Sequence, residues 1–290
     1  MTKKQELILV IRKRFNRFDV EAPDELVNYS RNQLILINRQ LTDARNASSI
    51  PDVKTIPFRK KRVQQNTWRR LNVNGIKNHH QALKIIHSLS APSKIPTYGY
   101  SLPAKTCITG SKLAKIQDSI CHDCYALDGW YNFSWVQNAL YKRLEAINHP
   151  KWVDAMVFKI LQMSLKWFRW HDSGDLQGLD HLHKIVQVAL RTPDTLHWLP
   201  TREYGIVRKY WEIHGGTPFY KLVPNMSLRL SATMFDKEPP LKLALKLGCQ
   251  VSGVSSTDYN CPASKQNHNC GNCRKCWEQK NFEIVYKKHK

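Results

Sequence analysis

Four cysteines lie close together near the end of the chain: Cys261, Cys270, Cys273 and Cys276. The last three have the spacing C-x2-C-x2-C, which suits a [4Fe–4S] cluster, because the bacterial ferredoxin ligand run begins in the same way. Cys261, which precedes Pro262, is the expected fourth ligand. Zinc held by the same thiols is the alternative, although zinc sites usually combine two separated cysteine pairs. The tail therefore predicts a metal centre held by four thiolates.

A second group of cysteines, Cys107, Cys121 and Cys124, lies in the first half of the chain. Cys121 and Cys124 form a C-x2-C pair, and His122 between them is a further candidate ligand. Three protein ligands leave one position of a metal open, where a substrate or small ligand can bind. The alternatives are that these thiols pack in the interior or complete a structural site. Cys249 is expected to be a buried core thiol, because Cys packs as a small hydrophobe.

Polar residues end an expected strand in the motif RWHDSGDL. His171 could transfer a proton, and Asp172 and Asp175 could hold ribose hydroxyls, an amine or a metal ion. Gly174 between them permits a sharp turn and the close approach of a ligand. A turn that only caps the next helix is the alternative.

The next expected strand ends in the motif WLPTRE, which contains Thr201, Arg202 and Glu203. Arg202 suits a bidentate contact with a carboxylate or phosphate. Polar residues also follow two later expected strands: Ser231 and Thr233, then Ser255, Ser256, Thr257 and Asp258. If these strands are parallel, their ends converge on one mouth, where ligands of βα barrels bind.

The elements that must position these residues alternate along the chain. Expected strands cover residues 168–176, 196–203, 226–235 and 249–257. Expected helices cover residues 130–147, 151–168, 179–192, 205–215 and 241–248. This alternation predicts parallel βαβ units. We therefore expect an α/β fold over residues 93–290, a partial or complete TIM-type βα barrel with a cysteine-rich C-terminal loop.

Residues 1–92 are expected to form a basic, mostly helical extension. One helix has Pro23 in its first turn, and a second, short helix is capped by Asn78. Residues 91–107 are rich in Pro and Gly, which predicts a loop and places the domain boundary near residue 92.

A basic run within this extension, Lys54 to Arg70, contains seven basic residues and no acidic residue, with Phe58 and Trp68 interleaved. Basic and aromatic side chains together can bind phosphates and stack on bases. The alternative is a solvated linker whose aromatic residues dock in the core. The candidate nucleic-acid-binding residues are Arg59, Lys60, Lys61, Arg62, Trp68, Arg69 and Arg70.

The composition favours a polyanionic partner. The chain has 290 residues and a formal net charge of +22, an excess that attracts nucleic acid. The apolar run from Leu7 to Ile11 is too short for a signal peptide, and we expect no membrane span. We therefore expect a cytoplasmic protein, where clustered cysteines indicate metal rather than disulfides. The oligomeric state is left open.

The motifs SLPAKTC, CHDCYALDGWY, FRWHDSGDL, WLPTRE and the terminal CP…C…C…CW resemble the gene product 88 family of phage proteins, over about residues 95–280. The layout is also similar, more weakly, to radical-SAM proteins, with a partial barrel and early cysteines that precede an aromatic residue. That likeness implies that Cys107, Cys121 and Cys124 hold a cluster. It also implies a SAM site near Gly174, Asp175, Thr201 and Arg202. The spacing of the three cysteines departs from the radical-SAM pattern. A phage origin implies the cytoplasm of an infected host.

Whether the protein is an enzyme stays open at this point, and three hypotheses follow. The first is a [4Fe–4S] protein that binds nucleic acid through its basic surface. The second is a radical-SAM-like enzyme with a cluster at the barrel mouth. The third is a zinc-stabilised nucleic-acid-binding protein or a metal-dependent nuclease that uses Asp172, Asp175 and Glu203, with His171 and Arg202 as further catalytic candidates.

Overall fold

The computed structural model describes residues 5–6 and 71–288. The chain divides into two compact units between Arg62 and Val63. The expected helix after Pro23 lies outside the described residues, and so do all seven candidate nucleic-acid-binding residues between Arg59 and Arg70.

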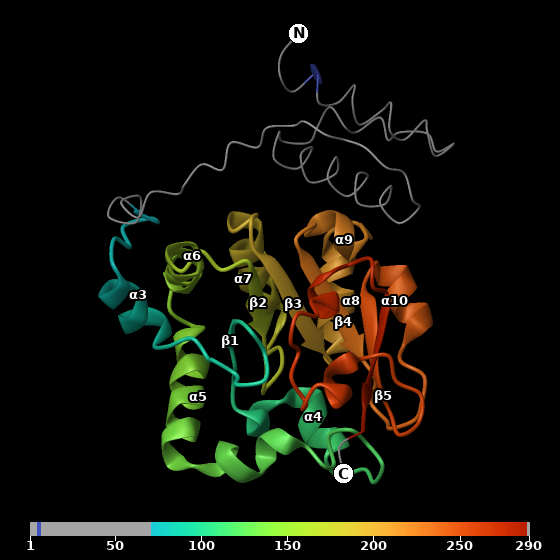
Figure 1. The fold of residues 1–290 in the computed structure, drawn as a ribbon. Helices are drawn as coiled ribbons and strands as arrows, with labels where there is room; N and C mark the ends of the chain where they lie inside the picture. The colour runs from blue at the N-terminus through green and yellow to red at the C-terminus, as the bar shows by residue number, and fades with distance from the viewer. Residues whose placement is uncertain (1–4, 7–70, 289–290) are drawn as a thin grey trace. The chain divides into compact units, whose positions relative to one another are not determined.

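A six-stranded parallel sheet forms the centre of the described region, in the order β1-β2-β3-β4-β5-β6 (Figure 1). The strands are β1 (Tyr98–Tyr100), β2 (Trp167–Trp170), β3 (Leu196–Thr201), β4 (Met226–Ser231), β5 (Gln250–Ser255) and β6 (Glu283–Lys287). The parallel βαβ prediction is confirmed. The sheet is open, with β1 and β6 as its edges, so the expected complete barrel is not formed. A TIM barrel closes with eight strands, and here only three residues of β1 pair with β2.

Helices connect the strands. They are α3 (His79–Ile86), α4 (Ile108–Leu113), α5 (Ser134–Ala146), α6 (Trp152–Gln162), α7 (Leu179–Arg191), α8 (Tyr204–Ile213), α9 (Phe219–Leu222) and α10 (Leu241–Leu247). Short 3-10 helices are η3 (Ala104–Thr106), η4 (Tyr125–Leu127), η5 (Gly129–Asn132), η6 (Pro262–Lys265) and η7 (Lys275–Trp277). Among the described residues, no helix is long and apolar enough to cross a membrane.

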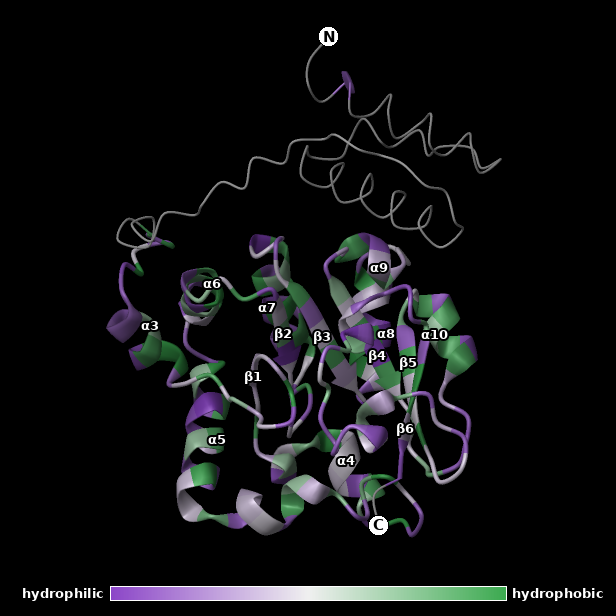
Figure 2. Cartoon of the chain, in the orientation of Figure 1, coloured by the Kyte–Doolittle hydropathy of each residue, from purple (hydrophilic) through white to green (hydrophobic). Residues whose placement is uncertain are grey.

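The two faces of the sheet bury different side chains. Phe168 and Trp170 of β2 belong to the main core, together with buried residues of α6, α7, α8 and α10. Helices α7 and α10 carry both hydrophobic and hydrophilic residues (Figure 2), as expected of helices with one buried side. Because strand side chains alternate, Trp167 and Arg169 point to the opposite face. There the tail packs in a smaller cluster that contains Trp198 and Trp277.

Local sequence accounts for much of this structure. Asn78 caps α3, as predicted, and its side chain accepts the Gln81 N–H at 3.0 Å. Ala82 and Ile86 of this helix are buried in the main core, so the packed unit includes residues before position 92. The strand β1 lies in the segment that was expected to be a loop, and β6 lies beyond the predicted strands.

Candidate functional site

Backbone hydrogen bonds hold the tail loop between β5 and β6 at two of its cysteines. The Cys261 N–H donates to the carbonyl oxygen of Val285 in β6 at 3.0 Å, and the Cys270 N–H donates to that of Lys94 at 3.0 Å. Cys273 N–H donates back to the Cys270 oxygen at 2.9 Å, which closes a tight turn. The loop therefore folds back over the sheet, and all eight cysteines of the chain are free thiols.

The four tail thiols lie near one another. Burial raises the pKa of Cys261, and the Cys273 thiol raises it further. Burial also raises the pKa of Cys270, with added contributions from Cys261 and Cys273. The pKa of Cys276 rises to about 11 through burial, while a contact of its Sγ with the Tyr286 hydroxyl at 3.4 Å lowers it. Cys261, Cys270 and Cys276 also pack in the same small cluster as Trp198 and Trp277.

Two guanidinium groups flank these thiols and have unused donors. Arg169 of β2 stacks 4.3 Å over Trp198, and Arg274 of the tail stacks 4.7 Å over Trp167. The Nε atoms of both arginines are buried and make no hydrogen bond. Both positive charges lower the pKa of Cys270. Buried N–H groups without a partner are costly, so this place suits an acceptor such as a sulfide or thiolate.

Arg229 anchors the tail to the centre of β4. Its side chain is fully buried and donates to six backbone carbonyl oxygens, of Val251, Lys275, Cys276, Glu278, Asn281 and Phe282. Burial lowers the pKa of Arg229, whereas the nearby Cys276 thiol raises it. Buried charge needs compensation, and ionised thiols beside it would supply that compensation.

The spacing of the tail thiols bears on the type of metal. Among the described residues, no three His, Cys, Asp or Glu side chains have the arrangement that holds a metal ion. A tetrahedral zinc site needs sulfurs within about 3.8 Å of one another, because each Zn–S bond is about 2.3 Å. A four-iron cluster spreads its ligands more widely over a cube of metal and sulfide. Four cysteine thiols are a donor set that both kinds of centre use.

The second cysteine group lies at the carboxyl ends of the strands. A Cβ atom built on Gly110 would lie 3.6 Å from the Cys107 Sγ and 3.7 Å from the Cys121 Sγ, so these two thiols flank the same glycine. Burial raises the pKa of Cys107, and Asp175, Cys124 and Cys121 raise it further. Burial also raises the pKa of Cys121, while Arg202 lowers it. The three thiols thus meet beside the polar strand ends.

Strands β3 and β4 position these cysteines. The Glu203 carboxylate accepts the Thr109 N–H at 2.7 Å and the Thr109 hydroxyl at 2.8 Å, which fixes the turn after Cys107. The Ile120 N–H donates to the Thr233 oxygen at 2.9 Å, which fixes the turn before Cys121. Glu203 therefore supports the cysteine segment.

Asp175 joins the ends of β2 and β3. Its carboxylate accepts the Thr201 hydroxyl at 2.6 Å and the Arg202 N–H at 2.8 Å, and burial raises its pKa to about 6. Gly174 beside it has φ +78°, and a Cβ there would lie 2.6 Å from the Leu102 Cβ. Glycine is needed at position 174 because Leu102 approaches it closely. Gly174 therefore allows these two segments of the chain to pack together.

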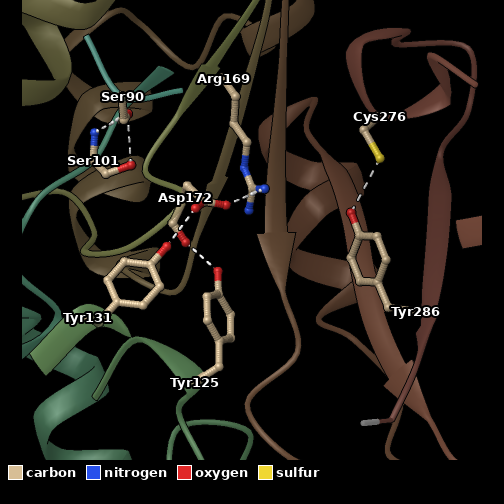
Figure 3. A network of polar contacts seen from close by, with 8 residues as sticks. All are labelled: Ser90, Ser101, Tyr125, Tyr131, Arg169, Asp172, Cys276 and Tyr286. Carbon is tan, nitrogen blue, oxygen red and sulfur yellow. Dashed lines mark hydrogen bonds and ion pairs between the residues drawn. The ribbon is translucent and has the colours of Figure 1, made fainter. Parts of the chain in front are cut away.

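Asp172 is the centre of a polar network with Arg169, Tyr125 and Tyr131 (Figure 3). Its carboxylate pairs with the Arg169 guanidinium at 2.7 Å and accepts the Tyr131 hydroxyl at 2.7 Å. Its backbone oxygen accepts the hydroxyl of Tyr125, which directly follows Cys124. The carboxylates of Asp172, Asp175 and Glu203 all bind donor groups of the protein. Few of their oxygen lone pairs are therefore left to bind the metal ions of a nuclease.

The remaining candidate side chains have other surroundings. His171 is buried, and neither of its ring nitrogens makes a hydrogen bond. His122 pairs with Asp123 at the surface, at 2.8 Å. Ser255 and Ser256 donate their hydroxyls to Asp236, at 3.0 and 2.8 Å.

Comparison with known families identifies the chain. The family model described as gene product 88 matches residues 64–279. The chain belongs to the gene product 88 family of phage proteins. No curated protein and no solved structure matches it. The region matched by the gene product 88 model contains all eight cysteines and every strand except β6.

Residues that the sequence reasoning missed are Arg169, Arg229, Tyr125, Tyr131 and Tyr286. The sequence does contain a signal that could have indicated the two arginines. Each stands between apolar neighbours inside a strand, in FRW and LRL, and alternation places it on the face opposite those neighbours. A charged residue in such a position indicates a polar, covered face. In this gene product 88 protein, that face lies under the cysteine-rich tail.

Proposed function

We propose that this gene product 88 protein binds a [4Fe–4S] cluster through Cys261, Cys270, Cys273 and Cys276. The observation that carries the proposal is the grouping of these four thiols beside the buried, unpartnered Nε–H groups of Arg169 and Arg274. A cluster ligated by four thiolates carries net negative charge, which Arg169, Arg229 and Arg274 would offset. When bound, it would supply one-electron redox chemistry.

The thiols must ionise before they bind iron. The raised pKa values of Cys261, Cys270 and Cys276 keep these three thiols protonated in the empty protein at neutral pH, so iron binding releases protons. The arginines lower that cost, because their charges favour the thiolate. Tyr286 contributes a hydroxyl to Cys276, and such contacts to ligand sulfur tune the reduction potential of a cluster.

Purification without oxygen tests this proposal. We expect iron and sulfide in a ratio of about one to one, with broad visible absorption that strong reductant bleaches. Cys270→Ser should abolish the absorption. Cys249→Ser is the matched control, because Cys249 is a buried thiol whose Sγ contacts the Leu247 oxygen, apart from both groups. A colourless protein with stoichiometric zinc would contradict the proposal of a [4Fe–4S] cluster.

Nucleic acid is the partner that we propose for the basic chain. The support is the net charge of +22 together with the run of seven basic residues between Lys54 and Arg70. Because phosphate contacts release counterions, affinity should fall linearly with the logarithm of salt concentration. Replacing Arg59, Lys60, Lys61 and Arg62 by Gln should reduce that slope by about four if each binds a phosphate. A slope unchanged by these substitutions would contradict the assignment.

A radical-SAM-like activity at Cys107, Cys121 and Cys124 is the second candidate. It is favoured by the position of three thiols at the carboxyl ends of parallel strands, beside Asp175 and Arg202. Three ligands leave a cluster position open. Reduced, iron-loaded protein should then cleave SAM, and Cys124→Ala should stop cleavage while the tail site stays filled. Absence of cleavage with iron loaded would end this candidate.

A further inference from the structure

Three aromatic side chains form an exposed group in η5 and at the start of helix α5. Trp130 is 76% exposed, Phe133 39% and Trp135 63%. The Phe133 ring stacks on the Trp135 ring, with centroids 4.6 Å apart, and the Trp130 ring meets Phe133 edge to face at 5.0 Å. Single exposed apolar residues are ordinary, whereas large ones in contact with one another mark a place where a partner binds. We call these three residues the aromatic platform.

Hydrogen bonds fix the segment that carries the platform. The Gln137 side chain donates to the backbone oxygen of Tyr131 at 2.6 Å, and the Asn132 side chain donates to that of Leu127 at 3.1 Å. The Tyr131 hydroxyl donates to the Asp172 carboxylate at 2.7 Å (Figure 3). A partner therefore meets rings that are already in place, which lowers the entropic cost of binding.

The surface around the platform suits flat rings and negative charge. The structure describes all of residues 129–144, and every exposed large apolar side chain among them is aromatic, including Tyr141 at 40% exposed. The aliphatic side chains of Val136, Leu140 and Leu144 are buried or half-buried. No acidic residue lies among residues 129–144, and Lys142 is exposed. Aromatic rings beside positive charge are the features with which proteins bind single-stranded nucleic acid.

Other partners fit this surface less well. Two copies of a chain with a net charge of +22 repel each other, which disfavours contact between copies. Helices that lie in a lipid surface expose Leu as well as Trp and Phe on one face. The Leu and Val side chains of α5 are instead turned inward.

We infer that the aromatic platform binds the unpaired bases of a single-stranded nucleic acid. This inference rests on the nucleic-acid partner proposed above and adds that the partner is single-stranded. One base stacks on the face of Trp135 that Phe133 leaves open, and a second base stacks on Trp130. The bases of a duplex already stack on one another, so they cannot reach the platform. Because every base has a face that can stack, the platform selects unpaired strands rather than a sequence.

Fluorescence anisotropy of a labelled single strand of about 15 nucleotides measures binding to the full chain. Trp130→Ala and Trp135→Ala should each raise Kd about tenfold, because each removes one stacking surface. Trp135→Phe keeps a ring and should raise Kd by less than about threefold. The dependence of Kd on salt concentration should keep its slope in all three variants, because no phosphate contact is lost.

A duplex of the same sequence is the first control. Its Kd should change by less than about twofold in the Trp130→Ala and Trp135→Ala variants. Tyr220→Ala is the matched control variant, because this aromatic side chain of α9 is 45% exposed and lies outside the platform. It should leave both Kd values unchanged. The midpoint of urea unfolding should stay nearly constant in every variant, since the substituted rings are exposed.

The possible outcomes separate this inference from the proposed function. Equal single-strand affinity of the wild type and of the variant carrying both Trp130→Ala and Trp135→Ala would overturn the inference. If that variant kept its affinity for the single strand but lost self-association, or lost binding to anionic phospholipid vesicles, the platform would belong to that other partner. A wild-type chain that binds neither single strand nor duplex at low salt would overturn the nucleic-acid partner itself, and the inference with it.

Discussion

The guanidinium of Arg229 donates to the carbonyl oxygen of Cys276 at 3.1 Å, joining the middle of the sheet to the last cysteine of the tail. Every hydrogen bond of this buried side chain goes to a backbone oxygen, and five of the six acceptors lie between residues 275 and 282. Arg229 therefore organises the segment that closes the tail loop, in addition to placing positive charge beside a thiol.

Replacing Arg229 should destabilise the protein. Arg229→Gln removes most of these donors and leaves buried carbonyl oxygens without partners, so the free energy of unfolding should fall by about 3–5 kcal/mol. Urea unfolding measures the loss. Arg208→Gln, at an exposed position of α8, is the control and should change stability by less than about 0.5 kcal/mol. Equal stability of both variants would show that the tail does not depend on this anchor.

A methyl group at Gly174 should also destabilise the fold. The φ angle of +78° strains any other residue, and the new Cβ would lie 2.6 Å from the Leu102 Cβ and 2.8 Å from the Leu102 oxygen. We expect Gly174→Ala to cost about 3 kcal/mol. Gly205→Ala is the matched control, because nothing lies within 4 Å of its built Cβ. It should be neutral or slightly stabilising, since Ala favours helix. Thermal unfolding distinguishes the two.

Stability should fall as the solution becomes acidic. Burial lowers the pKa of His181 and of His197 to about 3, from 6.5. Between those values the unfolded chain binds more protons than the folded chain, so acid favours unfolding. Lowering the pH from 7.5 to 5.5 should cost about 1.4 kcal/mol for each histidine. Urea unfolding at both pH values measures this loss.

The contribution of His197 to this pH dependence can be tested by substitution. Trp170 Nε1–H donates to His197 Nδ1 at 3.2 Å, so the ring is neutral with its proton on Nε2, toward Thr192. His197→Gln should reduce the acid-dependent loss by about 1.4 kcal/mol, whatever its effect at pH 7.5. A loss that stays the same would mean that this histidine can take up a proton inside the fold.

The sequence predicted the elements from α5 to β5, except the short helix α9, because hydrophobic periodicity determines them locally. Helix α7 has a strongly amphipathic pattern, and β4, MSLRLS, alternates apolar and polar residues. The short edge strands β1 and β6 were not predicted. β1 has three residues within a Pro- and Gly-rich segment, and its pairing with β2 is decided by a partner seventy residues away. β6 follows the cysteine-rich loop, and its pairing with β5 is likewise decided by residues distant in the sequence.

The sequence suggests the cysteine grouping but not the partners of the carboxylates. Spacing along the chain predicts that Cys261 joins the C-x2-C-x2-C run, because a short loop keeps its ends close, and metal binding by these thiols stays a prediction. Nothing local could predict that Asp172 would pair with Arg169, or that Glu203 would bind Thr109 from ninety-four residues away. Those contacts depend on the packing of distant segments, and they give both carboxylates partners within the protein.

Substitution of Glu203 tests whether its carboxylate holds the cysteine segment in place. Glu203→Gln keeps one oxygen for the Thr109 N–H but places an amide group opposite the hydroxyl, so the turn after Cys107 should loosen at a cost of about 1–2 kcal/mol. Iodoacetamide should then alkylate Cys107 faster in the iron-free protein, while Cys270 in the tail keeps its rate. Peptide mass spectrometry measures both rates in one sample. Glu238→Gln, at an exposed position, is the control and should leave both rates unchanged. Unchanged alkylation of Cys107 in Glu203→Gln would show that the two hydrogen bonds do not hold the cysteine segment.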